Sequence, residues 1–207
     1  MKLLVHICCG PCAIYPLKKI LDGKPVPEGL NQGMDVWGFF FNPNIHPYTE
    51  YKKRLEAVKI LADKMDIKMI YRDEYGLEEF LKHTLRTETV TQGFSLENVK
   101  PEGLSYNKRA RCGYCYSSRL EATAIAAKEN RFDYFSSSLL YSKYQDHDEI
   151  KKIGLGLADK YGVAFYYDDF RIGWKEGIKE SKDMGHYRQQ YCGCIFSEKE
   201  RYLYRAS

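Results

Sequence analysis

The chain of 207 residues lacks any apolar run long enough to cross a membrane, since a spanning helix needs about 20 consecutive residues of that kind. The apolar run over residues 2–7 is also too short for the core of a secretory signal peptide. We therefore expect a cytoplasmic protein with no membrane partner. Thiols stay reduced in the cytoplasm, so clustered cysteines there indicate metal binding or catalysis rather than a disulfide framework.

The sequence also lacks both glycine-rich phosphate-binding patterns, GxGxxG and GxxxxGK followed by Ser or Thr. We therefore expect no nucleotide cofactor. Internal repeats and low-complexity linkers are absent too, which favours one domain. A composition of 44% hydrophobic and 29% charged residues is that of an ordinary globular protein. The net charge of +4 is too mild to identify a partner by itself.

Strand patterns alternate with helix patterns along the whole chain. We predict strands over residues 2–7, 36–41, 67–71, 134–137 and 163–167. We predict helices over residues 13–21, 48–65, 77–83, 112–129, 146–161, 174–182 and 197–204. Such alternation implies right-handed crossovers, and hence an α/β fold with a parallel sheet of about five strands and helices on both faces.

The predicted organisation is a single α/β domain over residues 1–207. Residues 84–111 show no sustained period and form an inserted loop that is long enough to act as a lid. Residues 185–207 form a C-terminal tail that contains two cysteines and a short helix.

Seven cysteines are present, and they fall in three short groups, HICCGPC, CGYC and YCGC. The groups are Cys8, Cys9 and Cys12; Cys112 and Cys115; and Cys192 and Cys194. Thiolates at short spacings bind iron–sulfur clusters, zinc or copper(I), or exchange electrons as a dithiol. An adjacent pair and a CxxC are enough for a [4Fe–4S] cluster, and three thiols remain for a second redox or metal function. Structural zinc would use only four ligands and leave three without a role.

Three further features bear on catalysis. The first cysteine group follows the first predicted strand, and ligands of parallel α/β sheets bind beyond the carboxyl ends of the strands. Cys192 and Cys194 either ligate a metal or form a reducible disulfide that stores electrons. His46 follows the second predicted strand and is a candidate proton donor near the same sheet edge.

Basic and aromatic side chains alternate around the second and third cysteine groups. The candidates for RNA contact are Arg109, Arg111, Tyr116, Arg119, Arg188 and Tyr191. Basic groups neutralise phosphates and aromatic faces stack on unpaired bases, so these segments suit single-stranded or loop RNA. The alternative interpretation is a solvated, charged rim with half-buried tyrosines.

Taken together, these motifs resemble the QueH-type epoxyqueuosine reductases, the cobalamin-independent enzymes of queuosine formation in tRNA. The resemblance covers nearly the whole chain and is carried by LLVHICCGPC, FFFNPNIHPYTEYKKR, CGYCYSSRLEATA, FSSSLLYSKYQDHDEI, DDFRIGW and YRQQYCGCIFSEKERY. It implies a fold similar to the adenine-nucleotide α-hydrolases (HUP-type), a [4Fe–4S] cluster, and deoxygenation of epoxyqueuosine to queuosine at the wobble position of tRNA.

The resemblance also implies roles for the cysteines. The cluster ligands implied by motif are Cys8, Cys9, Cys112 and Cys115. Cys192 and Cys194 correspond to a redox-active pair. Some family members hold an extra iron beside the cluster and have a carboxylate where this chain has Cys12. Cys12 and Cys194, with one of the tandem pair Cys8 and Cys9, are therefore candidates for an additional iron site. The implied partners are the anticodon loop of queuosine-accepting tRNA and an external electron donor.

Two other interpretations compete with this one. CCG-type thiol–disulfide oxidoreductases also combine CCG with CxxC, but they place the motifs much closer together than Cys9 and Cys112 and lack the tyrosine–arginine tail. A non-catalytic, zinc-containing RNA-binding module would use the same residue types. Bound iron and sulfide would distinguish an epoxyqueuosine reductase of the QueH type from the zinc module.

Overall fold

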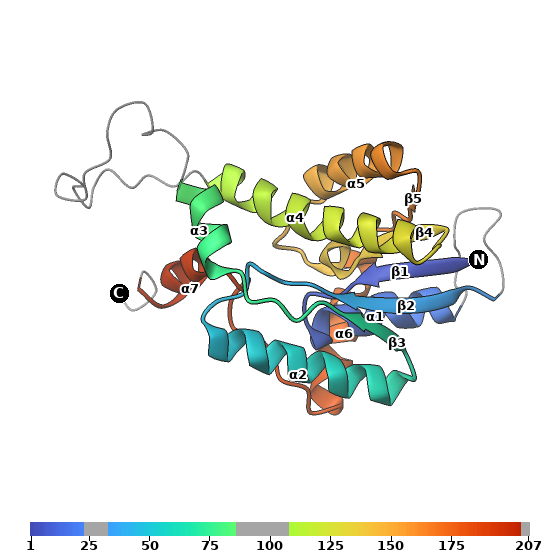
Figure 1. The fold of residues 1–207 in the computed structure, drawn as a ribbon. Coiled ribbons are helices and arrows are strands. Elements are labelled where there is room, and N and C mark those ends of the chain that lie inside the picture. Colours follow the sequence, from blue (N-terminus) through green and yellow to red (C-terminus); the bar gives the residue numbers. More distant parts are fainter. Residues whose placement is uncertain (23–32, 86–107, 204–207) are drawn as a thin grey trace.

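The computed structural model describes residues 1–22, 33–85 and 108–203. A five-stranded, all-parallel sheet in the order β3-β2-β1-β4-β5 runs through the centre of the molecule (Figure 1). Its strands are β1 (Lys2–His6), β2 (Asp35–Phe40), β3 (Lys68–Tyr71), β4 (Tyr134–Ser137) and β5 (Ala164–Phe165). This is the order of a doubly wound sheet, in which the chain starts in the middle and later crosses to the other half. The predicted fold class is confirmed.

Helices cover both faces of the sheet, with α4 and α5 on one side and α1, α2 and α6 on the other (Figure 1). The helices are α1 (Gly10–Leu21), α2 (Tyr48–Met65), α3 (Leu77–Leu85), α4 (Lys108–Glu129), α5 (His147–Tyr161), α6 (Trp174–Asp183) and α7 (Ile195–Tyr202). Two short 3₁₀ helices, η3 (Ser138–Tyr141) and η4 (Phe170–Gly173), follow β4 and β5. None of the helices in the described part of the chain is long and apolar enough to span a membrane.

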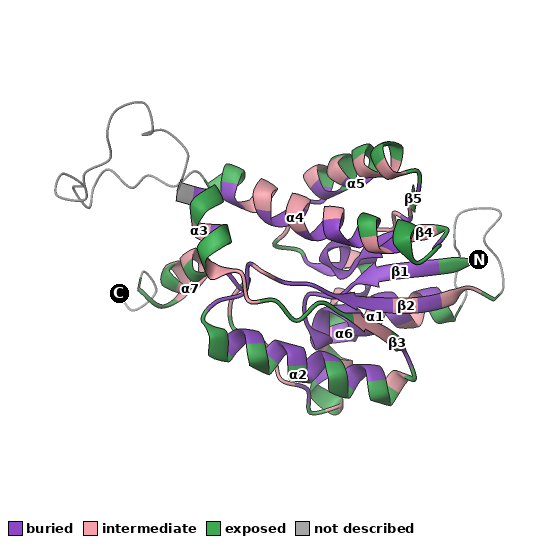
Figure 2. Ribbon diagram, in the orientation of Figure 1, coloured by how far each residue is buried: buried purple, intermediate pink, exposed green. Residues whose placement is uncertain are grey.

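The core lies between the sheet and these two helical layers, and Figure 2 shows the strands as mostly buried. Leu3, Leu4 and Val5 of the central strand are completely buried. A strand that is covered on both faces requires apolar side chains at successive positions, which explains why β1 reads as a continuous apolar run.

Several predicted boundaries were wrong in ways that matter for the site. α1 begins at Gly10 rather than residue 13, because Pro11 fits the first turn of a helix, where its missing N–H costs nothing. Cys9 is therefore the N-cap of α1. The last helix begins at Ile195 rather than residue 197, directly after its N-cap Cys194.

The predicted insert over residues 84–111 is partly helical. α3 continues to Leu85 and α4 begins at Lys108, four residues before the predicted start at Cys112. Arg109 and Arg111 consequently lie on the first turn of α4 rather than in a loop. Residues 86–107, to which the lid prediction mainly refers, lie outside the described residues.

Candidate metal centre

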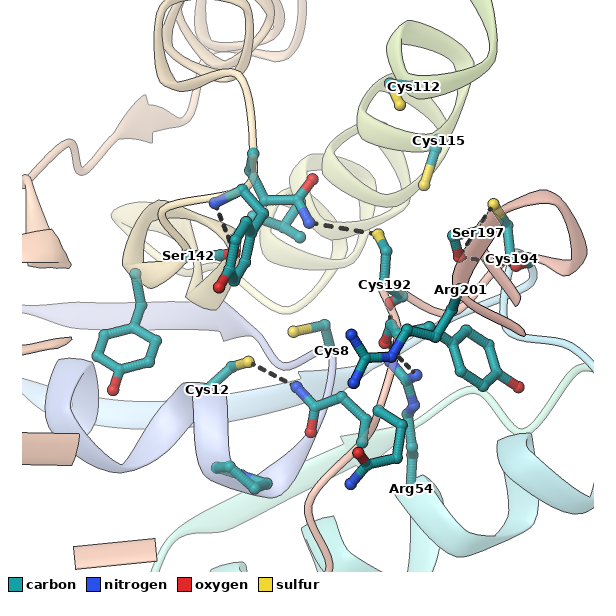
Figure 3. Close-up of a pocket in the computed structure, with 18 of the residues that line it drawn as sticks. Cys8, Cys12, Arg54, Cys112, Cys115, Ser142, Cys192, Cys194, Ser197 and Arg201 are labelled. Atoms are coloured by element: carbon teal, nitrogen blue, oxygen red, sulfur yellow. Dashed lines mark hydrogen bonds between the residues drawn. The ribbon is translucent and has the colours of Figure 1, made fainter. Parts of the chain in front are cut away.

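Six of the seven cysteines line one cavity of about 710 Å³. Cys8, Cys12, Cys112, Cys115, Cys192 and Cys194 surround it from three elements that are far apart in the sequence (Figure 3). The seventh, Cys9, contacts this group because its sulfur lies 3.7 Å from that of Cys8. The cavity lies beyond the carboxyl ends of β1 and β4, where parallel α/β sheets place their ligands.

The first cysteine group is preorganised at the start of α1. The sulfur atoms of Cys8, Cys9 and Cys12 all lie within 4.8 Å of one another, and all three residues are buried. Hydrogen bonds with the thiols of Cys12 and Cys9 hold the pKa of Cys8 well below its ordinary value. Gly10 makes this arrangement possible, because a Cβ there would lie 2.9 Å from the carbonyl oxygen of Ala57 in α2. The three thiols can hold a metal ion.

The second cysteine group faces the cavity from the first two turns of α4. The guanidinium of Arg119 donates to the sulfur of Cys115 at 2.8 Å and to its carbonyl oxygen at 2.9 Å. Burial raises the pKa of the Cys115 thiol, and the positive charge of Arg119 acts in the opposite direction. Arg119 is 2% exposed, and no carboxylate in the described part of the chain pairs with it. A buried cation without a carboxylate needs another negative charge nearby, which a thiolate at Cys115 can supply.

The third cysteine group lies on a tail segment that is tied to α2. Arg54 of α2 donates to the carbonyl oxygens of Cys192 at 2.9 Å and Tyr191 at 3.0 Å. The backbone N–H of His46 donates to the carbonyl oxygen of Gly193 at 2.8 Å. Gly193 has a φ of +141°, a conformation that favours glycine. These contacts hold Cys192 beside the cavity.

A buried ion pair supports Arg54 in turn. Glu50, one helical turn earlier, accepts from Arg54 Nε at 2.7 Å, and the hydroxyl of Tyr187 donates to the same carboxylate. Arg54 is 1% exposed. The network therefore joins α2 to the tail at two points, since Glu50 contacts Tyr187 and Arg54 contacts the backbone of Tyr191.

Among the described residues that line the cavity, cationic side chains outnumber carboxylates. Glu200 is the one carboxylate among them. The cations are Arg54, Lys108, Arg111, Arg119, Arg188 and Arg201. Burial alone would lower the pKa of Arg111, but Cys194 and Glu200 keep it raised. An excess of fixed positive charge in one concave site favours anionic ligands, including thiolate-bound metal clusters and phosphates.

The predicted RNA-contact residues are only partly brought together. Arg111, Tyr116, Arg119, Arg188 and Tyr191 line the cavity. Arg109 does not line it and is exposed on the first turn of α4.

His46 contacts the tail of the third cysteine group through its backbone rather than its ring. The ring is completely buried and lies against Phe80 and Tyr75, with centroids 5.0 and 5.6 Å away. Burial lowers its pKa to about 4. The ring does not line the cavity, so the geometry lends the predicted role of His46 as a proton donor no support.

Three polar residues that were not predicted as site residues orient the thiols. The hydroxyl of Ser138 accepts from the backbone N–H of Cys8 at 3.1 Å and donates to its sulfur at 3.4 Å. The side-chain amides of Gln145 and Gln189 donate to the sulfurs of Cys192 at 3.3 Å and Cys12 at 3.2 Å. Ser138 and Gln145 belong to the block FSSSLLYSKYQDHDEI, which pointed to this segment without distinguishing its members.

A doubly wound α/β fold that gathers thiols from three segments at its strand ends defines a metal- or redox-active cysteine protein. Residues 3–200 match the family described as "Epoxyqueuosine reductase QueH". The chain belongs to this family rather than to the CCG-type oxidoreductases.

Two relatives illustrate how far the similarity extends. An epoxyqueuosine reductase QueH of Dehalococcoides mccartyi is 34% identical over 201 residues, which cover 97% of this chain and 94% of the relative. One from Thermotoga maritima is 35% identical over 201 residues, covering 96% and 91%. Among solved structures, the U34-tRNA thiolase NcsA from Methanococcus maripaludis with its [4Fe-4S] cluster aligns over 97% of this chain and 62% of its own, at 11% identity and a TM-score of 0.48.

Proposed function

We propose that this protein reduces the epoxide of epoxyqueuosine to the alkene of queuosine in tRNA, with a [4Fe–4S] cluster bound in the thiol-lined cavity. Reduction of epoxyqueuosine is the activity that the name of its family states. The observation that carries the proposal is the meeting of three distant cysteine groups at one cavity with buried arginines. Cytoplasmic location follows from a tRNA substrate and thiols that must stay reduced.

The donor set fits a cluster of this kind. We assign its four ligands to Cys8, Cys9, Cys112 and Cys115, an adjacent pair and a CxxC that approach the cavity from α1 and α4. A cubane with four thiolates is anionic, and Arg119 beside Cys115 offers it a buried counter-charge. When bound, the cluster supplies electrons one at a time.

The reaction needs two electrons and two protons, because the epoxide oxygen leaves as water. Closing a dithiol of Cys192 and Cys194 to a disulfide would supply both. Two S–H bonds break and one S–S bond forms. Both C–O bonds of the epoxide break, its C–C bond becomes a C=C bond, and the oxygen takes up the two protons as water. Two electrons from an external one-electron donor and two protons from solvent then restore the dithiol.

An additional iron held by Cys12 and Cys194 is the second way to store an electron. It is favoured by the position of Cys12, whose sulfur lies within 4.8 Å of those of Cys8 and Cys9. The two versions differ in whether Cys194 carries a proton or a metal in the resting enzyme.

Anaerobic purification tests the proposal. The protein should be brown, contain iron and sulfide, bleach with dithionite, and convert epoxyqueuosine in tRNA to queuosine. Cys112→Ala should lose both cluster and turnover. Cys192→Ala should keep most of the iron but lose turnover. A colourless protein that contains only zinc would overturn the proposal in favour of a zinc-containing RNA-binding module.

The same variants distinguish the two versions of the redox store. If Cys194→Ala lowers iron by about one atom per chain while sulfide is unchanged, Cys194 is an iron ligand. If iron is unchanged and the disulfide that forms on single-turnover oxidation is lost, Cys194 belongs to the dithiol. Unchanged turnover in both Cys192→Ala and Cys194→Ala would exclude a redox role for this pair.

A further inference from the structure

Part of the cavity wall is aromatic and is formed by Tyr141, Tyr144 and Trp174. Tyr141 ends η3 and Trp174 begins α6, and their ring centroids are 5.1 Å apart. Tyr144 packs edge-on against Trp174 with centroids 5.7 Å apart, yet it is 85% exposed. A tyrosine that is held in place but left open to solvent at a cavity wall is poised to stack on a flat ligand.

We propose that Tyr144 and Trp174 stack on an unpaired nucleobase of the substrate RNA and guide it toward Cys192. The identity of this RNA as a tRNA anticodon loop rests on the proposed function. Base–aromatic stacking tolerates any base because every base has a π face, which suits entry of an unpaired nucleotide.

The chain segment after η3 links stacking to chemistry. Tyr144 is followed directly by Gln145, whose amide donates to the sulfur of Cys192 at 3.3 Å. The carbonyl oxygen of the same amide accepts from the hydroxyl of Tyr116 at 2.9 Å, which fixes the orientation of Gln145. A base stacked on Tyr144 is therefore next to Gln145, whose side chain contacts the exposed thiol of Cys192.

Two features of the cavity lining favour RNA over a protein partner. Arg188 and Arg201 line the same cavity, and cations at a stacking site neutralise the phosphates that flank an unpaired base. The oxygen Oε1 of Gln189 is buried without a hydrogen-bond partner in the described part of the chain. It offers an acceptor for an N–H group of a base, while its amide nitrogen donates to Cys12.

The chain contains only two tryptophans, which gives a direct test. Trp37 lies on β2, packs against Phe132 and does not line the cavity, so the variant Trp37→Phe leaves Trp174 as the sole reporter. With this anaerobically purified variant, an anticodon stem-loop RNA with guanine at the wobble position should quench Trp174 emission to saturation. The same RNA with an abasic site at that position should bind with much weaker quenching.

Substitutions at Tyr144 test the wall itself. Tyr144→Ala should weaken stem-loop affinity, measured by fluorescence anisotropy, about tenfold, whereas Tyr144→Phe should bind as the parent does because it keeps the ring. The matched control is Ile172→Ala, which removes an 81% exposed apolar side chain close to Trp174 but outside the cavity lining. It should leave affinity unchanged.

The inference is overturned if the stem-loop binds without changing Trp174 emission, or if Tyr144→Ala binds as tightly as Ile172→Ala. An RNA affinity that is unchanged in Tyr144→Ala, combined with slower reduction by the electron donor, would assign the wall to a donor protein instead. Quenching by stem-loop RNA in a protein that fails to reduce epoxyqueuosine would leave the inference standing and overturn the proposed function. Equal quenching by the free nucleoside would identify a nucleoside site and exclude guidance by the RNA.

Discussion

Three arginines are almost completely buried beside the cysteines, and each finds its negative partner differently. Arg54 pairs with Glu50 and Arg111 with Glu200, while Arg119 reaches the sulfur of Cys115. A buried cation is costly unless a nearby anion compensates it. An arginine beside a buried thiol favours the thiolate form, so removing Arg119 should disturb any metal that Cys115 binds.

Removing Arg119 should weaken the proposed cluster. Arg119→Gln leaves the ligating thiolates without their counter-charge, so iron and sulfide per chain should fall. The midpoint potential of the remaining cluster should drop by about 60 mV, the shift that a tenfold change in relative stability gives for one electron. A redox titration followed by electron paramagnetic resonance measures it.

The controls separate charge from shape. Arg119→Lys keeps the charge but loses the planar fork, and should be intermediate. Lys128→Gln removes an exposed cation at the end of the same helix and should change nothing. A midpoint potential in Arg119→Gln equal to that of Lys128→Gln would contradict the assigned role.

Arg54 should position the Cys192–Cys194 segment. Arg54→Met removes both hydrogen bonds to the tail and leaves Glu50 buried without its cationic partner, which should cost about 3–5 kcal/mol in the free energy of unfolding. Loosening the tail should also speed alkylation of Cys194, which is 6% exposed. Urea unfolding and mass spectrometry of iodoacetamide-treated protein measure the two effects.

Lysine should not rescue this site, because one ammonium cannot reproduce the two-carbonyl contact of a guanidinium. Lys59→Met, an exposed position on the same helix, is the matched control. If Cys194 is alkylated no faster in Arg54→Met than in Lys59→Met, Arg54 contributes to stability but does not position the Cys192–Cys194 segment.

At the scale of elements, the cysteines sit where helices begin. Cys9 is the N-cap of α1, Cys194 is the N-cap of α7, and Cys112 and Cys115 occupy the first two turns of α4. The N-terminal end of a helix carries a partial positive charge that favours thiolates. Correct placement of these three helix starts is therefore a condition for assembling the site.

The packing of α1 on α2 tests this condition. Gly10→Ala places a methyl group 2.9 Å from the backbone oxygen of Ala57, which cannot move without shifting α2. We expect a loss of about 1–3 kcal/mol in the free energy of unfolding and less metal bound by the adjacent thiols. Thermal unfolding and Co(II) absorption of the metal-free protein measure these changes.

A second glycine gives the control with the opposite sign. Gly156 lies on the exposed side of α5 with open space around its Cα. Gly156→Ala should therefore stabilise the protein by about 0.5–1 kcal/mol, because alanine loses less backbone entropy in a helix. If both substitutions had the same effect, the tight approach of α1 to α2 would not be a constraint.

At the scale of the whole molecule, charge is concentrated rather than abundant. The net charge is only +4, yet the described cavity lining holds six cations and one carboxylate. Concentrated charge steers anionic partners toward one face and gives binding a strong dependence on salt.

Binding of tRNA should weaken steeply as salt increases, because neutralised phosphates release counterions. Arg188→Ala should lower affinity for every tRNA and reduce the slope of log affinity against log salt by about one. Filter binding over a range of KCl concentrations measures the slope. Lys152→Ala, an exposed cation on α5 outside the cavity lining, should keep the slope; equal slopes in both variants would contradict a phosphate contact at Arg188.

Local patterns were enough to predict the α/β class, the parallel sheet and the position of the first cysteine group at a strand end. Apolar runs and helical periodicity depend on neighbours in the chain, so residues 48–65 and 134–137 were predicted with the bounds that the structure has. The starts of α1 and α7 were predicted less accurately, since capping by Cys9 and Cys194 leaves no typical side-chain signal.

The sequence by itself determined the chemistry of this protein, since the number, spacing and type of its cysteines are properties of the chain. Only the tertiary structure decided which side chains surround them. The contacts of Arg54 with the tail, of Gln145 with Cys192 and of Tyr144 with Trp174 join different elements. The reason is physical: local pattern sets which face of an element is apolar, whereas strand order and helix packing set which faces meet.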